Sequence, residues 1–341
     1  MKSSDQKKIL IIRFSSFGDI IQALSVVSAL KKNEKNFEIH WALRSDMREL
    51  ASLHPDIDKI WSLDRKEGLK GLFSLAKNLG REHFDYVYDA HSNLRSFLLV
   101  FLLRFFGFFT FFKRPKKRFL RFCLFTLRID FLKKDRRGML TFQRPLEKLN
   151  LGEFDSSRVQ WHFPQGMIDK CRQMIKEKFG EGMFVTLAPS AAWEMKRWPL
   201  SYWKNLIELM SDTKFVILGG PNDFFCADLE KVAPERVMNL AGKLTLLESC
   251  ALVKISPLVI VADTGILHVA DLFGTSAIGL LGPTAFGFTT GKHVKILEVS
   301  LPCRPCTKDG RGKCSRKIYQ QCLGDISPEE VAIEANRLLA N

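Results

Sequence analysis

Apolar and polar positions follow two alternating periods along the first half of the chain. Short apolar runs at 8–14, 37–43, 57–63 and 84–91 predict buried strands. The stretches between them predict helices at 19–32, 46–54 and 68–82, the first with Ile20, Leu24, Val27 and Leu30 on one face. Strands that alternate with helices predict a parallel sheet with right-handed crossovers.

The alternation resumes after a less periodic stretch around residues 141–166. Apolar runs predict strands at 183–190, 214–220, 257–265 and 276–284, and amphipathic stretches predict helices at 200–212, 222–233, 244–256 and 266–274. The second half is therefore expected to form another open α/β unit. We expect a boundary between residues 165 and 180 and divide the chain into domains 1–170 and 171–341.

Residues 94–137 interrupt this alternation. The segment holds twelve phenylalanines, many Lys and Arg residues and only two Asp residues. Its longest uncharged runs, 96–103 and 105–112, are too short to span a bilayer. Basic residues interleaved with large apolar ones favour a helix or helical hairpin that lies in a membrane interface. The alternative is a core helix followed by a solvated basic loop.

Composition narrows the class of protein. Apolar residues make up 46% and charged residues 26% of the 341 residues, which is typical of a globular protein. The net charge of +15 indicates an anionic partner, such as nucleic acid, an acidic membrane surface or a phosphorylated ligand. The sequence shows no secretory signal and no apolar run of about 18 residues. We therefore expect a cytoplasmic protein whose eight cysteines are thiols.

Two turns in the second half could bind phosphate, because ligands of open parallel sheets bind at the carboxyl ends of the strands. After the strand at 257–265, Thr264 and Gly265 begin a helix whose free amides suit phosphate, and His268 lies in its first turn. The alternative is a simple helix cap with a buried histidine. After the strand at 183–190, Lys196 could neutralise a phosphate or belong to a surface charge pair.

A third turn follows the first predicted strand and reads "SSFGD", residues 15–19. It has one glycine and lacks the three-glycine dinucleotide fingerprint, so the first half is no obvious NAD or FAD binder. Asp19 either starts the next helix or acts as a general base at the carboxyl end of the strand.

Four of the eight cysteines crowd into one segment near the carboxy-terminal end. It contains one Cys-x-x-Cys pair, whereas zinc sites often combine two such pairs. The spacing leaves a metal site open beside inert thiols, stress-formed disulfides or local packing. The four residues are Cys303, Cys306, Cys314 and Cys322.

Several stretches recur together in one known family. They are "ILIIRFSSFGDIIQALSVVSALKK", "DAHSNLRS", "KRWP" and "VADTGILHVADLFGTSAIGLLGPT", followed by a Cys-rich tail that ends in "DISPEEV". In this order, over nearly the whole chain, they resemble glycosyltransferase family 9, the ADP-heptose:lipopolysaccharide heptosyltransferases. The resemblance implies an α/β GT-B fold, in which two Rossmann-like open parallel-sheet domains face each other across a cleft. It also implies that the amino-terminal domain binds the acceptor and the carboxy-terminal domain binds the nucleotide sugar.

The resemblance further implies an inverting transfer of heptose from ADP-heptose to a lipid A–core acceptor, with no cofactor and no metal. Asp19 corresponds to the proposed base. Acceptor contacts are expected at Ser15, Ser16, Asn93 and Arg95. Donor contacts are expected at Lys196, Glu248, Asp263, Thr264, Gly265, His268 and Ser190. The family's Pro-Gly-Ser turn reads Pro189, Ser190, Ala191 here, which displaces the hydroxyl by one position.

The expected partners are the nucleotide sugar, the anionic core acceptor and the cytoplasmic face of the inner membrane, without nucleic acid. Three alternatives remain open at this stage. One is transfer from another nucleotide sugar on the same fold. A second is a basic nucleic-acid-binding protein, although the aromatic residues form apolar blocks rather than spaced stacking platforms. A third is an NAD-dependent oxidoreductase, which the missing glycine fingerprint disfavours.

Overall fold

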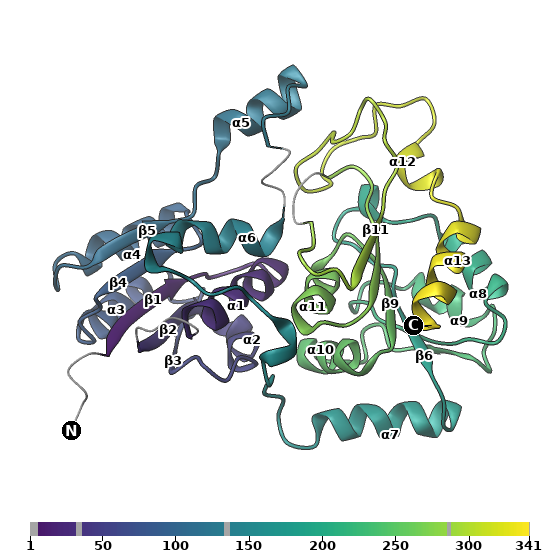
Figure 1. The fold of residues 1–341 in the computed structure, drawn as a ribbon, viewed down its shortest axis with the longest axis horizontal. Coiled ribbons are helices and arrows are strands. Elements are labelled where there is room, and N and C mark those ends of the chain that lie inside the picture. Colours follow the sequence, from purple (N-terminus) through teal and green to yellow (C-terminus); the bar gives the residue numbers. More distant parts are fainter. Residues whose placement is uncertain (1–5, 32–35, 133–136, 285–287, 341) are drawn as a thin grey trace. The chain divides into compact units, whose positions relative to one another are not determined.

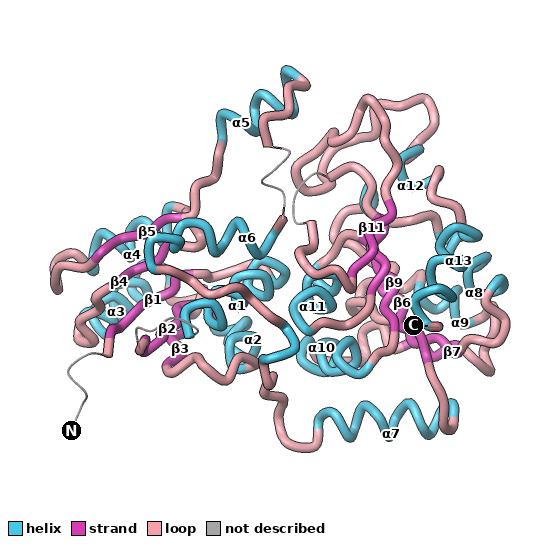
Figure 2. Tube along the Cα trace, viewed as in Figure 1, coloured by secondary structure: helices cyan, strands magenta, loops and turns pink. Residues whose placement is uncertain are grey.

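The fold is described from a computed structural model, for residues 6–31, 36–132, 137–284 and 288–340. The chain divides into two compact units, each built around its own parallel sheet. Unit 1 comprises Met1–Arg118 and Arg137–His162, and unit 2 comprises Phe119–Arg136 and Phe163–Asn341. Helices and strands alternate along most of both units (Figures 1 and 2), as the hydrophobic pattern predicts.

Unit 1 holds a five-stranded sheet in the order β3-β2-β1-β4-β5, with every pair parallel. The central strand is buried from Ile9 to Ile12 at 0% exposure, which is typical of a parallel sheet covered on both faces. The strands are β1 (Lys7–Ile12), β2 (Phe37–Arg44), β3 (Lys59–Leu63), β4 (Tyr86–Asp89) and β5 (Thr110–Lys113). The helices are α1 (Phe17–Lys31), α2 (Arg48–Ser52), α3 (Gly68–Gly80), α4 (Leu94–Leu103) and α6 (Gly138–Gln143).

Helices α3 and α4 cover one face of this sheet. Leu72 of α3 and Leu99 of α4 pack in one apolar cluster with Leu10 of β1. On α1, every residue from Ile20 to Leu30 is buried, and the helix contacts α6. Because the helix is buried on all sides, the apolar face predicted from the sequence is only part of its buried surface.

Strand β5 differs from both interpretations of segment 94–137. The segment begins with α4, as a core helix would, but Thr110–Lys113 then pairs in parallel with β4 and extends the sheet. The short strand is mostly exposed at the sheet edge, so it lacks the buried apolar run that marks β1, β2 and β4. The next helix, α5 (Arg118–Phe122), is followed by a single π-helical turn. Among the described residues, no helix combines the length and apolar character needed to cross a bilayer.

Unit 2 holds a six-stranded parallel sheet in the order β11-β10-β9-β6-β7-β8. One apolar cluster joins its strands to α8 and α13, including Trp203 and Val331. The strands are β6 (Phe184–Ala188), β7 (Lys214–Ile217), β8 (Val237–Asn239), β9 (Leu258–Ala262), β10 (Ala277–Leu280) and β11 (Val294–Leu297). The helices are α7 (Met167–Phe179), α8 (Leu200–Leu209), α9 (Cys226–Glu230), α10 (Leu246–Ile255), α11 (Gly265–Phe273), α12 (Gln321–Gly324) and α13 (Pro328–Leu339).

Each sheet reverses its winding direction beside its first strand. In unit 1 the chain builds β1, β2 and β3 to one side and then β4 and β5 to the other, so the switch lies between β1 and β4. In unit 2 it lies between β6 and β9 for the same reason. Ligands of open α/β sheets bind at such points, outside the carboxyl ends of the strands. All three turns selected from the sequence lie at these two points.

Candidate functional site

The turn after β1 surrounds one carboxylate with cationic side chains. Asp19 lies in the first turn of α1, and its Oδ2 accepts a hydrogen bond from Ser16 Oγ at 2.9 Å and pairs with Arg13 Nη2. Its Oδ1 lies 3.7 Å from Arg114 Nη1. The Asp19 side chain is 35% exposed, whereas that of Arg13 is 8% exposed. The Asp19 carboxylate therefore remains accessible to a ligand, whereas the Arg13 guanidinium that pairs with it is buried.

The two guanidinium groups share one aromatic support. Arg13 follows β1, donates Nη1 to the carbonyl of Ala90 at 2.8 Å, and lies 5.5 Å from the centroid of the Phe142 ring. Arg114 follows β5 and lies 3.7 Å from the same centroid, with Nη2 donating to Thr141 Oγ1 at 2.8 Å. Stacking on an aromatic face fixes a guanidinium with little loss of its charge. Helix α6 thus positions both cations beside Asp19.

The turn after β4 is organised by the buried carboxylate of Asp89. Its Oδ1 accepts the amides of His91 and Ser92, at 3.0 and 2.7 Å, and its Oδ2 accepts Ser96 Oγ at 3.0 Å. Burial, reinforced by the Arg13 guanidinium, lowers the pKa of His91 to about 4, although Asp19 acts in the opposite direction. His91 is therefore uncharged at neutral pH.

The expected acceptor residues have different surroundings. Ser16 is exposed and bonded to Asp19, and Ser15 beside it is half-buried. Asn93 caps α4, because its Oδ1 accepts the amide of Ser96 at 2.9 Å. Arg95 is exposed in the first turn of that helix. The structure therefore brings Ser16 to Asp19 and gives Asn93 a local structural contact.

At the switch point of unit 2, a lysine from one turn meets an aspartate from the other. Lys196 follows β6 in a short 3-10 turn, and its Nζ lies 3.0 Å from Oδ2 of Asp263, which follows β9. Thr284 Oγ1, after β10, donates to the same oxygen at 2.5 Å. The Lys196 and Asp263 side chains are only 16% and 8% exposed. Ser190 is half-buried in the Lys196 turn, just after β6.

Helix α11 begins at the same edge of the sheet. Thr264 is its N-cap, and its Oγ1 accepts the amide of Ile266 at 3.3 Å; Gly265 is the first helical residue. Amides in a first helical turn lack intrahelical partners and favour anions. His268 is buried near Asp271, and burial raises the pKa of the Asp271 carboxyl despite that neighbour. The start of α11 combines the geometry of a helix cap with that of an anion site.

Glu248 has structural partners for both carboxylate oxygens. Oε2 accepts the amide of Thr245 at 2.8 Å, and Thr245 Oγ1 accepts the amide of Glu248 at 3.2 Å, so the two form a capping box at the start of α10. Oε1 lies 2.6 Å from Lys170 Nζ. Lys170 and the Thr245 amide hold the pKa of Glu248 below its usual range. A ribose bound here would share these oxygens with existing partners.

Sequence patterns missed the side chains that support these charges. Arg13 could have been considered, because it comes directly after a predicted strand. Arg114 is one of many basic residues in segment 94–137, so nothing in the sequence distinguished it. Its contact with Asp19 depends on strand β5, which was not predicted. Thr284 gave no signal, because its bond to Asp263 joins turns 21 residues apart.

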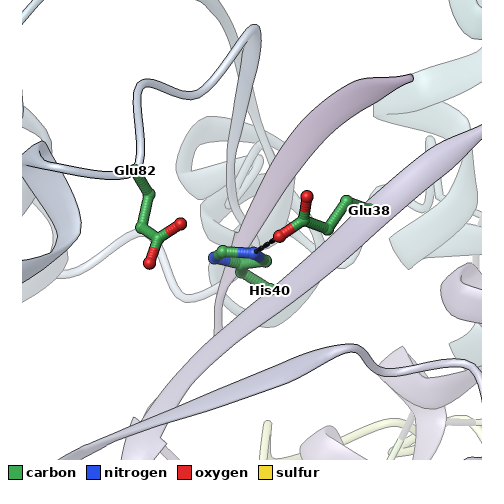
Figure 3. Close-up of side chains that lie close together, drawn as sticks. All are labelled: Glu38, His40 and Glu82. Atoms are coloured by element: carbon green, nitrogen blue, oxygen red, sulfur yellow. Dashed lines mark hydrogen bonds and ion pairs between the residues drawn. The ribbon is translucent and has the colours of Figure 1, made fainter. Parts of the chain in front are cut away.

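The cysteines of residues 303–322 are free thiols. Within the described ranges, only one group of three or more potential metal ligands has its ligand atoms within 4.8 Å of one another: Glu38, His40 and Glu82. Figure 3 shows the hydrogen bond between Glu38 and His40, in which Glu38 Oε1 lies 2.8 Å from His40 Nε2. Lys8 and Lys59 both pair with Glu82, at 3.1 and 3.0 Å.

The other ring nitrogen of His40 is also used, because Trp61 Nε1 donates to Nδ1 at 3.2 Å. Burial lowers the pKa of His40, so the ring stays neutral. This group lies at the amino ends of the strands, opposite the edge that carries Asp19. We interpret it as an ion-pair network that stabilises the start of the sheet.

Comparison with known proteins adds independent information. The family described as "Glycosyltransferase family 9 (heptosyltransferase)" matches residues 72–320. A lipooligosaccharide heptosyltransferase 2 of Haemophilus ducreyi is 25% identical over 98% of this chain and 99% of its own length.

Solved structures resemble the whole chain. The E. coli ADP-heptose lps heptosyltransferase II has a TM-score of 0.71 at 18% identity, covering 98% of both chains. The E. coli heptosyltransferase WaaC with ADP-2-deoxy-2-fluoro heptose has a TM-score of 0.66 at 17% identity, covering 96% of this chain and 99% of the other. These likenesses support the two-sheet GT-B fold.

Proposed function

Because this chain belongs to glycosyltransferase family 9, we propose that it transfers heptose from ADP-heptose to the lipid A–core acceptor of lipopolysaccharide. The observation that carries the proposal is the chemistry at the two switch points. One presents an accessible carboxylate, Asp19, and the other a cation, Lys196, beside the first turn of a helix. Acid–base chemistry on the acceptor and anion binding for the donor need these two kinds of group.

Asp19 is the proposed general base. In the proposed reaction its carboxylate takes the proton of an acceptor hydroxyl as that oxygen attacks the anomeric carbon of the heptose. The new C–O bond forms as the bond to the diphosphate breaks, which inverts the anomeric centre. Arg13 and Arg114 hold the carboxylate, and Ser15, Ser16, Asn93 and Arg95 are the candidate contacts for the acceptor.

The donor would bind unit 2. Lys196 and the amides at the start of α11 would neutralise the charge that grows on the departing ADP. The remaining candidate contacts follow the same edge, at Ser190, Glu248, Asp263, Thr264, Gly265 and His268. The proposed division of labour therefore follows the predicted domains, with the acceptor on residues 1–170 and the donor on residues 171–341, except that residues 119–136 and 163–170 group with unit 2.

A thermal-shift panel tests the donor. ADP and ADP-heptose should raise the melting temperature, because a ligand at about 100 times its Kd stabilises the folded state by about 2.7 kcal/mol. UDP, UDP-sugars and NAD at equal concentration should give no shift. Stabilisation by a UDP-sugar would replace ADP-heptose with another donor, and stabilisation by NAD alone would contradict the proposal.

We also propose that α4 docks unit 1 on the cytoplasmic face of the inner membrane. The helix buries Leu99 and Leu103 but exposes Phe97 at 60% and Phe101 at 52%. The row continues past the helix with Phe105 at 73% and Phe108 at 99% exposure. The exposed Arg95 precedes this row, and the exposed Arg104 lies between Phe101 and Phe105 in the sequence. An apolar row interleaved with cations suits an anionic bilayer surface, which also presents the proposed acceptor.

Vesicle sedimentation tests this surface. The variant Phe97→Ser/Phe101→Ser/Phe105→Ser should lose about tenfold or more in partitioning to vesicles that contain phosphatidylglycerol. A matched control, Leu209→Ser/Phe224→Ser/Ile333→Ser, removes three exposed apolar side chains of unit 2. Equal loss in both variants, or unchanged binding in the first, would contradict the proposed docking surface.

A further inference from the structure

The Cys-rich segment, residues 301–322, crosses the turn that carries Lys196. Its first part is tied to the loop after β10. Arg304 donates to the carbonyl of Gly282 in this loop and to that of Val299 after β11. The amides of Cys306 and Thr307 donate to the carbonyl of Pro283 at 3.0 and 3.2 Å. That loop continues into Thr284, the hydroxyl partner of Asp263. The segment is therefore anchored beside the Lys196–Asp263 pair.

Its last part is tied to the Lys196 turn itself. Gln320 Nε2 donates to the carbonyl of Glu194 at 2.7 Å, and Tyr319 Oη donates to Glu194 Oε1 at 3.4 Å. Between the two anchors, the Arg311 guanidinium lies 5.1 Å from the centroid of the Trp193 ring. Contacts on both sides of the turn fix how the segment lies across it.

Gly310 makes the closest approach. A Cβ added at this glycine would lie 2.6 Å from both Cγ and Cδ of Lys196 and 3.2 Å from Cβ of Trp193. The backbone of Gly310, at φ +90°, thus packs directly on the aliphatic part of the lysine. No side chain fits between them. The ammonium group of Lys196 emerges from this contact toward Asp263.

We propose that the Cys-rich segment positions Lys196 for the donor diphosphate, with Gly310 as the positioning residue. The inference rests on the proposed function, because it assigns Lys196 to the diphosphate. A lysine has four rotatable side-chain bonds, and ordering it for a ligand costs conformational entropy. A backbone packed against its stem removes that cost before the ligand arrives, which is preorganisation for binding.

Two glycines of the segment provide a matched test. Gly310 and Gly312 both have positive φ, +90° and +105°, but a Cβ at Gly312 would meet no atom within 4 Å. Gly310→Ala and Gly312→Ala therefore share the backbone strain and differ in the contact with Lys196. By calorimetry, Gly310→Ala should weaken ADP binding about fivefold, whereas Gly312→Ala should change it less than about twofold. Equal effects of the two would overturn the inference.

A double-mutant cycle separates this inference from the proposed function. Lys196→Met should weaken ADP binding by about tenfold or more, through loss of a charge-assisted contact. Adding Gly310→Ala to Lys196→Met should then have no further effect on the Kd for ADP, because the substitution at Gly310 acts on binding only by displacing the lysine. A full additional loss would overturn the positioning role. Unchanged binding in Lys196→Met would instead contradict the assignment of Lys196 to the diphosphate.

A second variant keeps the test open if Gly310→Ala does not fold. Gln320→Gly removes the hydrogen bond to the carbonyl of Glu194 and suits the positive φ of +51° at that position. It should weaken ADP binding by about threefold in the wild-type background and not at all in Lys196→Met. Unaltered ADP binding by a folded Gln320→Gly protein would count against the segment as a positioning element.

Discussion

The two sheets carry related ion pairs at equivalent edges, but they bury them differently. In unit 1 the carboxylate of Asp19 is 35% exposed and its partner Arg13 is 8% exposed. In unit 2 both members are largely buried, Asp263 at 8% and Lys196 at 16% exposure. Both carboxylates have a cation and a hydroxyl as partners, but only the partly exposed one is open to proton exchange with a ligand. Burial thus distinguishes a carboxylate that suits chemistry from one that suits positioning.

The largest expected effect on activity comes from a substitution of Asp19, which breaks the ion pair of unit 1. Asp19→Asn keeps an oxygen acceptor for Ser16 and Arg13 but removes the base, so kcat should fall by about 10²–10⁴-fold. Heptose transfer measured by product analysis checks this. Ser16→Ala keeps the base but removes its hydrogen bond and one candidate acceptor contact, and it should retain activity within about tenfold. A folded Asp19→Asn enzyme with full activity would exclude Asp19 as the base.

The second pair should respond mainly in stability. Asp263→Asn leaves Lys196 largely buried without its opposite charge, which should lower the free energy of unfolding by about 2 kcal/mol. Asp19→Asn should change it by less than about 1 kcal/mol, because that carboxylate is partly solvated and the buried Arg13 keeps its hydrogen bond to the carbonyl of Ala90. Urea titrations of the two variants compare them directly. A larger loss in Asp19→Asn would reverse the distinction drawn from burial.

Arg114 offers a smaller and more selective effect. Its guanidinium lies 3.7 Å from Asp19 Oδ1 and stacks on Phe142. Arg114→Met should keep the apolar contact but lose the charge, and kcat/KM for the acceptor should fall by about tenfold. The Kd for ADP, measured in the absence of acceptor, should stay the same, since Arg114 belongs to unit 1. A change in ADP affinity without a change in kcat/KM would contradict this assignment.

The smallest effect is a pH dependence from His91. Its pKa is about 4 in the folded protein and about 6.5 in the unfolded chain. The unfolded chain binds more protons between these values, so this contribution to stability is complete above about pH 6.5 and is lost as the pH falls toward 4. After allowance for solvent screening, the loss at pH 5 should be about 1 kcal/mol.

Urea titrations at pH 7 and pH 5 measure this contribution. His91→Gln should lose less stability between the two values than the unsubstituted protein, whereas a variant of the exposed His83, His83→Gln, should behave as the unsubstituted protein does. Identical pH dependence in all three proteins would contradict the assignment to His91.

Local patterns sufficed for much of this architecture. Apolar residues recur with clear periods in the buried strands and amphipathic helices, so the alternation of strands and helices could be predicted. The three turns at the carboxyl ends of strands followed from that alternation. The capping boxes at Asn93 and Thr245 were also readable, as Asn-x-x-Ser and Thr-x-x-Glu, and would have indicated structural contacts for Asn93 and Glu248. Those contacts do not test ligand binding by either residue.

Long-range contacts lay beyond the sequence. Arg114 reaches Asp19 only because an exposed edge strand pairs with β4. The approach of Gly310 to Lys196 joins residues more than a hundred positions apart, and it depends on anchors at both ends of the Cys-rich segment. Neither contact follows from hydrophobic periodicity, because tertiary packing sets both.

The ion-pair network of Glu38, His40 and Glu82 has a consequence for how this protein can change. Together with Lys8 and Lys59 it ties the amino ends of several strands, far along those strands from the turn of Asp19. The contacts that stabilise the sheet thus lie at the amino ends of its strands, and the proposed catalytic residue lies at their carboxyl ends. Libraries that randomise the carboxyl-edge turns should yield mostly folded variants, whereas equal randomisation of the amino edge should not. Substitutions in the carboxyl-end turns can change specificity without unfolding the sheet, because the ion pairs at the amino ends stabilise it.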